Sequence, residues 1–205
     1  MRCLLVASLL VSQAALAQDS APPVLRLPDG VRPIRYAAEL TIRPAESGFR
    51  GTIEIEVEVA RPTPVVWLNA RFLAVESASV GGTAAQVIDG GQDFVGLRMQ
   101  PPLAPGRSAL RVEYRGELSE RDTAGAFRQR EAGEWYVYTQ LEPIYARRVF
   151  PCFDEPAYKV PWQLTLVVPA GHLAVSNTPQ VGETSLPDGM KRVAFAPTQI
   201  GRAHV

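Results

Sequence analysis

The side chains with the clearest capacity for chemistry lie between residues 140 and 155. Gln140 and Glu142 set an amide and a carboxylate two positions apart. A carboxylate in a partly desolvated pocket holds an ammonium group through a charge-assisted hydrogen bond. A carboxylate and an amide of this kind could hold a cationic group, but their types and spacing alone do not select that role. The competing interpretation is an ordinary solvated carboxylate at the end of a strand, because most glutamates lie in solvent.

Metal binding and nucleophilic catalysis have few candidate residues in this chain. Only two histidines occur, His172 and His204, and there is no His-Glu-x-x-His or Cys-x-x-Cys motif. A tetrahedral zinc site needs three or four well-spaced ligands. The remaining candidates, Cys152, Asp154 and Glu155, are too tightly spaced around a proline. The sequence also lacks a Gly-x-Ser-x-Gly elbow and a glycine-rich phosphate loop. A Ser-His-Asp triad using His172 stays open, although a lone histidine in a strand is more often structural.

The segment from Tyr138 to Lys159 reads YTQLEPIYARRVFPCFDEPAYK. It closely resembles the signature of the aminopeptidase N family of zinc metallopeptidases. In that family a Thr-Gln-x-Glu run precedes an Arg-Arg/Lys-x-Phe-Pro-Cys-Phe-Asp-Glu-Pro block. Flanking positions also agree with the family, from Leu27 to Ala196. A match along so long a segment is specific, and it extends the resemblance over nearly the whole chain after residue 17.

This resemblance implies a saddle-shaped β domain that precedes a catalytic domain. In the family, the catalytic domain carries a Gly-x-Met-Glu-Asn loop and a His-Glu-x-x-His zinc helix, and neither motif occurs in this sequence. Zinc would then be bound by the downstream catalytic domain, and this chain alone would be inactive. The implied role of Glu142 is to hold the α-amino group of a peptide substrate. Gln140 would line the pocket for the first side chain of that peptide.

The block from Arg147 to Pro156 is expected to be structural. Its two arginines, Arg147 and Arg148, would pair with the acidic residues at its end, Asp154 and Glu155. The residues expected to be buried are Phe150, Cys152 and Phe153. In this interpretation the block holds Glu142 in position and faces the catalytic domain.

The elements that position these residues are expected to be strands. From Gly51 to Ala60 apolar and polar residues alternate, which a strand separates onto two faces and a helix would scatter. The other expected strands are 38–42, 65–68, 74–80, 94–99, 109–114, 135–139, 163–168, 172–176 and 191–195. Leu118 to Gly133 is charged and contains glycine, so it is interpreted as a surface loop, with a helical turn as the open alternative. Many short strands separated by turn residues predict an all-β, saddle-shaped, multi-stranded β-sandwich.

The two ends of the chain are not expected to belong to the fold. Residues 1–17 have the basic start, apolar run and cleavage site (Ala15-Leu16-Ala17) of a secretory signal peptide. We expect export to the periplasm or the extracellular space and a mature β domain over residues 18–199. Cys152 is then the single cysteine of the mature chain, which excludes an internal disulfide. Residues 200–205 resemble the translation of a sequencing adapter and are expected to be a non-native tail.

Charge and hydropathy restrict the expected partners. Lys and Arg total 21 and so do Asp and Glu, and the chain lacks the clustered basic residues that nucleic-acid binding needs. No run is long and apolar enough for an integral membrane protein. We therefore expect the substrate-amine-anchoring N-terminal domain of a zinc-dependent aminopeptidase, with a peptide substrate and its own C-terminal catalytic domain as partners. Two alternatives stay open: a non-catalytic exported β-sandwich binding module, and a family relative that has lost its zinc ligands.

Overall fold

A computed structural model describes residues 21–199, and their regular structure is almost entirely β-strand. The strands are β1 (Val31–Ile42), β2 (Gly48–Val59), β3 (Thr63–Asn69), β4 (Leu73–Val80), β5 (Thr83–Ala84), β6 (Gln86–Asp89), β7 (Phe94–Leu103), β8 (Gly106–Glu117), β9 (Gly125–Glu131), β10 (Glu134–Gln140), β11 (Trp162–Pro169), β12 (Gln180–Ser185) and β13 (Met190–Phe195). The helical content of the described residues is the 3-10 turn η1 (Ala146–Arg148). The predicted all-β class is confirmed, whereas the predicted signal peptide (1–17) and tail (200–205) lie outside the described residues.

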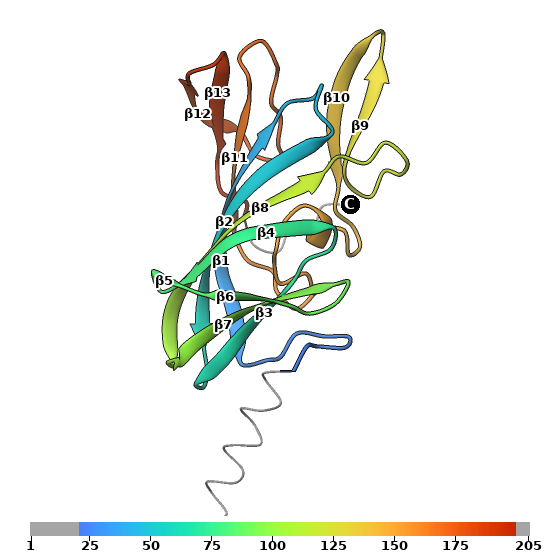
Figure 1. The fold of residues 1–205 in the computed structure, drawn as a ribbon. Coiled ribbons are helices and arrows are strands. Elements are labelled where there is room, and N and C mark those ends of the chain that lie inside the picture. Colours follow the sequence, from blue (N-terminus) through green and yellow to red (C-terminus); the bar gives the residue numbers. More distant parts are fainter. Residues whose placement is uncertain (1–20, 200–205) are drawn as a thin grey trace, which may run out of the picture.

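The strands form three sheets. The largest has eight strands in the order β12-β13-β11-β1-β2-β8-β4-β5, and the others are β3-β7-β6 and the hairpin β10-β9. In Figure 1 the large sheet is long and twisted, the three-stranded sheet lies against one part of it, and the hairpin stands apart from both. The pairing of β1 with β11 is parallel, and β2 and β8 continue the sheet in antiparallel register. The two packed sheets confirm the predicted sandwich.

Alternation along β2 fixes which face of the large sheet is buried. Ile53, Ile55 and Val57 have no exposed surface, while Glu54 and Glu58 between and beyond them are exposed. Burying one such aliphatic side chain stabilises a fold by about 1.5–3 kcal/mol. Because a shift of one residue would move every apolar side chain of β2 into water, this pattern also fixes the register against β1 and β8.

The core between the sheets also contains the block that follows η1. In β3 the neighbouring residues Trp67 and Leu68, which point to opposite faces of the strand, are 2% and 0% exposed, so this strand is covered on both faces. Phe150, Cys152 and Phe153 belong to the same cluster of buried residues, with exposed fractions of 5%, 1% and 5%. Their predicted burial is therefore confirmed, and the core connects the block directly to the large sheet.

The strand prediction was wrong in several places, and β5, β6 and β12 were not predicted. Leu118 to Gly133 is not only a surface loop, because it contains β9, whose sequence is too polar for an apolar alternation. β9 pairs with β10 in a two-stranded sheet, where few side chains need to be buried. Conversely, residues 172–176 are not a strand, although their apolar residues alternate. Leu173 and Val175 are 86% and 73% exposed, so the alternation there does not correspond to a buried face.

Gly51 provides a test of packing in the core. It pairs with Tyr114 across β2 and β8, and a Cβ atom at Gly51 would lie 2.3 Å from Cζ of that ring. We expect Gly51→Ala to destabilise the chain by about 1–3 kcal/mol, because the buried ring must shift. Gly48→Ala in the same strand is the control, since its Cβ would meet ordinary contact distance, 3.5 Å from the Gly116 carbonyl. Equal thermal unfolding midpoints for the two variants would contradict this prediction.

Candidate functional site

Gln140 and Glu142 lie at the base of the β9–β10 hairpin. Gln140 is the last residue of β10 and pairs with Gly125 of β9, and Glu142 lies in the turn that leads to η1. Both side chains are exposed. The Tyr145 N–H donates to the Leu141 carbonyl at 2.9 Å, which closes this turn. The structure thus presents the amide and the carboxylate on the surface of one short connection, free to meet a ligand.

Arg147 fastens the start of the block to its end. Its Nε donates to Oδ2 of Asp154 at 2.9 Å, and its Nη2 donates to the Asp154 carbonyl at 3.0 Å. The two side chains are each only 12% exposed, so the ion pair is largely shielded from water. The backbone N–H of Arg147 also approaches Oδ2, at 3.3 Å. The predicted pairing of Arg147 with an acidic residue at the end of the block is confirmed.

Arg148 does not pair with Glu155, so that part of the prediction was wrong. Its Nη1 lies 3.3 Å from Oδ2 of Asp122 and 3.5 Å from the Ala124 carbonyl. Consecutive residues of a 3-10 turn point about 120° apart, which sends Arg148 away from the side that Arg147 faces. Glu155 instead accepts the Leu27 N–H at 2.6 Å.

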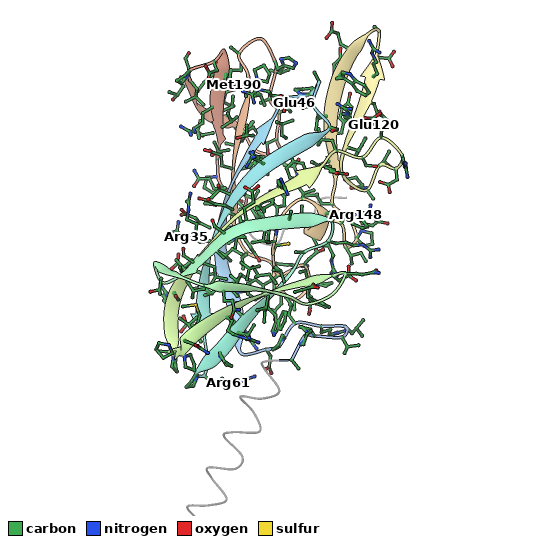
Figure 2. All side chains as sticks on the ribbon, viewed as in Figure 1. Arg35, Glu46, Arg61, Glu120, Arg148 and Met190 are labelled. Carbon is green, nitrogen blue, oxygen red and sulfur yellow. The ribbon has the colours of Figure 1, made fainter. Side chains whose placement is uncertain are left out.

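Asp122 is a positioning residue that the sequence analysis missed. Its carboxylate accepts the Ala124 N–H at 3.2 Å, and this bond, followed by contacts with Ser119 and Arg148, lowers the pKa of Asp122. The carboxylate of an aspartate often accepts the backbone N–H two residues later and so forms a turn. The presence of an aspartate in this loop was the signal in the sequence that pointed to this role. Arg148 also lies near two aromatic rings, 5.3 Å from Phe72 and 5.0 Å from Tyr145. The bonds to Asp122 and Ala124 connect η1 to the loop before β9, and the contact with Phe72 connects it to the residue before β4; Arg148 is labelled in Figure 2.

Asn69, at the end of β3, ties the block to the sandwich. Its backbone exchanges two hydrogen bonds with Cys152, at 2.8 and 3.0 Å, and its Oδ1 accepts the Asp154 N–H at 3.0 Å. The Phe153 N–H donates to the hydroxyl of Tyr36, a buried residue of β1. Because these donors and acceptors are paired inside the core, the path of the chain after Arg147 is closely determined.

Cys152 is a buried thiol and not a reactive one. It is 1% exposed, and burial raises the pKa of its thiol well above the ordinary value, an effect that the charge of Asp154 reinforces. A thiolate is the form that attacks electrophiles or binds metals, and this environment disfavours it. Cys152 therefore acts as a small hydrophobic residue of the core.

The residues that the structure describes do not fit a zinc site. No group of three or more His, Cys, Asp or Glu side chains within residues 21–199 is placed to hold a metal ion. Asp154 is held by Arg147, Glu155 accepts a backbone N–H, and Cys152 is a buried thiol. The three clustered residues therefore have structural partners, and we derive no metal chemistry from them.

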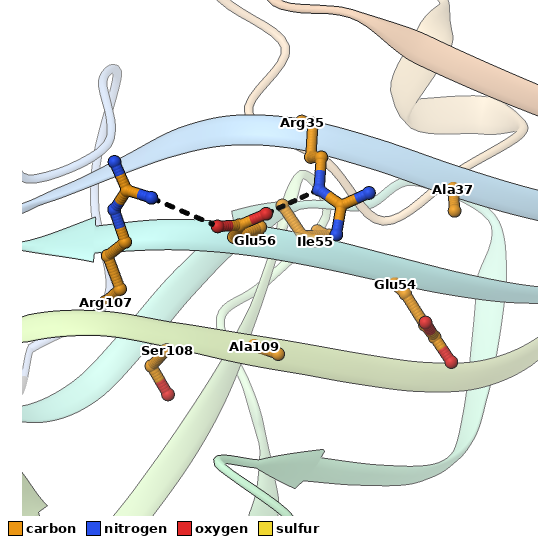
Figure 3. A pocket seen from close by; sticks show the side chains of 8 residues that line it. All are labelled: Arg35, Ala37, Glu54, Ile55, Glu56, Arg107, Ser108 and Ala109. Atoms are coloured by element: carbon orange, nitrogen blue, oxygen red, sulfur yellow. Dashed lines mark hydrogen bonds and ion pairs between the residues drawn. The ribbon is translucent and has the colours of Figure 1, made fainter. Parts of the chain in front are cut away.

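A shallow depression on the outer face of the large sheet is a second feature of the surface. Figure 3 shows it on β1, β2 and β8, with Glu56 lying between Arg35 and Arg107. The hydrogen bond from Arg35 lowers the pKa of Glu56, with a further contribution from Arg107. Since these charges are paired with each other and open to solvent, the depression has no group directed at a ligand. It is an ion-pair network on a solvated face, which contributes little to stability.

Gly125 lies between Gln140 and Arg148, because it pairs with Gln140 across the hairpin and its backbone packs against the Arg148 side chain. It has a φ of 78°, which favours glycine, and a Cβ added to it would lie 2.7 Å from Cβ of Arg148. We expect Gly125→Ala to displace the base of the hairpin and to shift the backbone resonances of Gln140 in an NMR spectrum. Gly133→Ala is the matched control, because Gly133 has a φ of 92° but no neighbour within 4 Å. If both variants disturb Gln140 equally, backbone strain and not the contact with Arg148 is responsible.

Across residues 21–199, no helix has the length and apolar character that a bilayer span requires.

Comparison with protein families gives one match along most of the chain. Residues 32–201 match the model of the peptidase M1 N-terminal domain. Among curated proteins, aminopeptidase M1-D of Oryza sativa subsp. japonica is 38% identical over 168 residues, which cover 77% of this chain and 19% of that protein. Aminopeptidase 2 of Candida albicans is 30% identical over 212 residues, which cover 97% of this chain and 23% of that protein. The chain thus spans about a fifth of the length of these relatives.

Among solved structures, a crystal structure of an M1 zinc metallopeptidase variant from Deinococcus radiodurans bound to a Tyr-Ser-Ala substrate has a similar fold. It aligns with a TM-score of 0.68 and 25% sequence identity, covering 83% of this chain and 40% of that one.

Proposed function

The chain belongs to the M1 peptidase family through its N-terminal domain, and from this premise we propose that it holds the amino terminus of peptide substrates for a zinc aminopeptidase. The observation that carries the proposal is the exposed pair Gln140 and Glu142, presented by a short turn between a hairpin and a buried block. The M1 relatives named above are aminopeptidases, which supports a peptide as the ligand.

Glu142 supplies the negative charge with which an exopeptidase can bind the amino terminus of its substrate. At neutral pH a peptide amino terminus is largely a cation, and a carboxylate holds it through a charge-assisted hydrogen bond stronger than a neutral one. Fixing the amino terminus also fixes which peptide bond reaches the reacting groups. Gln140 lies two residues earlier and can donate and accept hydrogen bonds beside the first side chain. This domain therefore contributes to the reaction by binding and orienting the peptide substrate.

We place the zinc and the hydrolytic step in a part of the whole protein outside residues 21–199. No described cluster fits the metal, and the chain spans about a fifth of its relatives. When bound there, zinc would supply Lewis-acid activation of water and of the peptide carbonyl. The block from Arg147 to Pro156 would face that catalytic part, because it is continuous with the turn that carries Glu142. The 205-residue chain alone should then have no peptidase activity.

We also propose that the protein is exported. The first seventeen residues have the composition of a cleaved signal, which would place the mature protein in the periplasm or outside the cell. Amino-terminal sequencing of the secreted protein should begin at Gln18, and a retained Met1 would contradict export by cleavage.

The proposed function is tested on the whole zinc-loaded protein with a matched pair of peptides. Leu-Ala-Ala with a free amino terminus should be hydrolysed to release leucine, and the N-acetylated peptide should not. Removing the metal with a chelator should abolish hydrolysis, and added zinc should restore it. Equal hydrolysis of the two peptides would contradict amine recognition. Absence of hydrolysis in the metal-loaded protein would favour a non-catalytic binding module.

A further inference from the structure

Residues 21–30, which form the lead-in to β1, contact the end of the block through Leu27. This residue is 6% exposed and belongs to the core cluster, whereas Val24 and Leu25 before it are 97% and 81% exposed. The Leu27 N–H donates to Oε1 of Glu155 at 2.6 Å, in a partly buried position. Because a carboxylate accepts a hydrogen bond more strongly than a neutral oxygen does, this bond firmly connects two segments that are far apart in the sequence.

The lead-in is also fixed after Leu27, where it meets the connection between β2 and β3. The Ala60 N–H donates to the Gly30 carbonyl at 2.9 Å. Nη1 and Nη2 of Arg61 each lie 3.3 Å from Oδ1 of Asp29. The same guanidinium lies so close to Gly30 that a Cβ added there would be 3.0 Å from Cζ of Arg61. The position of Leu27 is therefore set by the end of β2, and its N–H is a fixed donor.

The block needs a fixed point at its end, because the chain leaves the core there. Phe153 is 5% exposed, Glu155 is half-buried, and the next two residues are exposed. The Tyr158 N–H donates to the Glu155 carbonyl at 3.0 Å, which closes a turn, and the Tyr158 ring packs edge-on against Phe153. The hydrogen bond from Leu27 ties this turn to the core.

A short series of contacts connects Glu155 to the turn that carries Glu142. Asp154, the residue before Glu155, accepts Nε and the backbone N–H of Arg147 at 2.9 and 3.3 Å. Arg147 belongs to η1, which begins directly after Tyr145, and the Tyr145 N–H closes the turn that carries Glu142. A displacement at the end of the block therefore reaches that turn through one ion pair and one 3-10 turn.

We propose that Glu155 is a positioning residue for the amine anchor Glu142. By holding the Leu27 N–H it fixes the end of the block, and the pair of Asp154 with Arg147 passes this constraint to the turn. The inference rests on the proposed function, because Glu142 is the group that is positioned. A loose turn would let the Glu142 carboxylate take up positions in which it misses the amine, and ordering it again on binding lowers the affinity for the peptide.

The first test measures amide hydrogen exchange in the whole zinc-loaded protein. We expect Glu155→Ala to speed exchange of the Tyr145 and Arg148 N–H groups by about tenfold, because loss of a hydrogen bond to a charged group makes local opening easier. Glu155→Gln should keep exchange slow, since its amide oxygen can still accept the Leu27 N–H. Glu117→Ala, which removes an exposed carboxylate at the end of β8, is the control. An equal rise in exchange across β2 would indicate a loss of global stability alone and would overturn the positioning role.

The donor is tested independently with a matched pair of changes at position 27. Leu27→Ala and Leu27→Pro both shorten the buried side chain, but only proline removes the backbone N–H. Leu27→Pro should therefore speed exchange in the turn that carries Glu142 more than Leu27→Ala does. Equal effects of the two changes would show that the apolar contact and not the hydrogen bond holds the lead-in, which overturns the proposal. This pair also decides the question if Glu155→Ala does not fold.

Kinetics connect the positioning role to the substrate. With Leu-Ala-Ala, Glu155→Ala should raise KM by about three- to tenfold while kcat changes by less than about twofold, and Glu155→Gln should retain the original KM. Hydrogen exchange needs no substrate, so it separates this inference from the proposed function. If Glu142→Ala raises KM but Glu155→Ala leaves exchange and KM unchanged, the anchor stands and the positioning role of Glu155 is overturned. If Glu142→Ala leaves KM unchanged, the proposed function fails, and this inference fails with it even where Glu155→Ala speeds exchange.

Discussion

Glu142→Ala is expected to raise KM for short peptides by about 10- to 100-fold in the whole zinc-loaded protein. The estimate follows from the loss of a hydrogen bond between charged groups, which contributes about 1.5–3 kcal/mol. Because the amine is bound in the substrate and in the transition state alike, the effect should appear mainly in KM. Thermal stability should not change, since Glu142 is exposed and lies in a turn.

The control for this prediction is Glu134→Ala, which removes an exposed carboxylate from the other end of β10. It has the same change in charge and should leave KM unaltered. A second comparison uses a substrate in which a hydroxyl replaces the amino group, because such a substrate has no ammonium to lose. Glu142→Ala should affect it little. An unchanged KM for the amine substrate would refute the role assigned to Glu142.

The architecture could be predicted from the sequence where burial imposes a period on the residues. The alternation in β2 exists because Ile53 and Ile55 are fully buried on one face, so the pattern and the strand have the same cause. β9 could not be found in this way. Its residues pair with β10 across an open hairpin, where backbone hydrogen bonds form without an apolar face to mark the strand. Leu173 and Val175 show the converse error, since they alternate without being buried.

The residues of the candidate site could be predicted only where a motif or a short distance along the chain pointed to them. Gln140 and Glu142 were found through their resemblance to a known motif, and composition alone would have left Glu142 a solvated carboxylate. The partner of Arg147 was found because it lies a short distance along the chain. The partner of Arg148 was not, because Asp122 comes from a loop brought near by the hairpin and no local pattern points to it. Contacts set by tertiary packing are the part that the sequence leaves undetermined.

Arg147→Ala should be among the most destabilising single changes in the block that supports Glu142. It leaves the Asp154 carboxylate, 12% exposed, without the guanidinium that balances its charge. Removing one partner of a buried ion pair costs about 3–5 kcal/mol. For a domain of this size the thermal midpoint should fall by about 10 °C. Scanning calorimetry of the chain measures this, with Arg35→Ala as the control, because the Arg35 side chain is 68% exposed and its loss should change little.

The double variant with Asp154→Asn separates charge from shape. It removes the uncompensated carboxylate while keeping a side chain of similar size, so it should recover part of the stability that Arg147→Ala loses. If the double variant is no more stable than Arg147→Ala, the arginine acts through packing and not through its charge. Comparing the kinetics of the two single variants distinguishes a residue that binds the substrate from a residue that supports the fold. Glu142→Ala should change KM without a change in stability, whereas Arg147→Ala should change both, because the turn that carries Glu142 is held only while the block is folded.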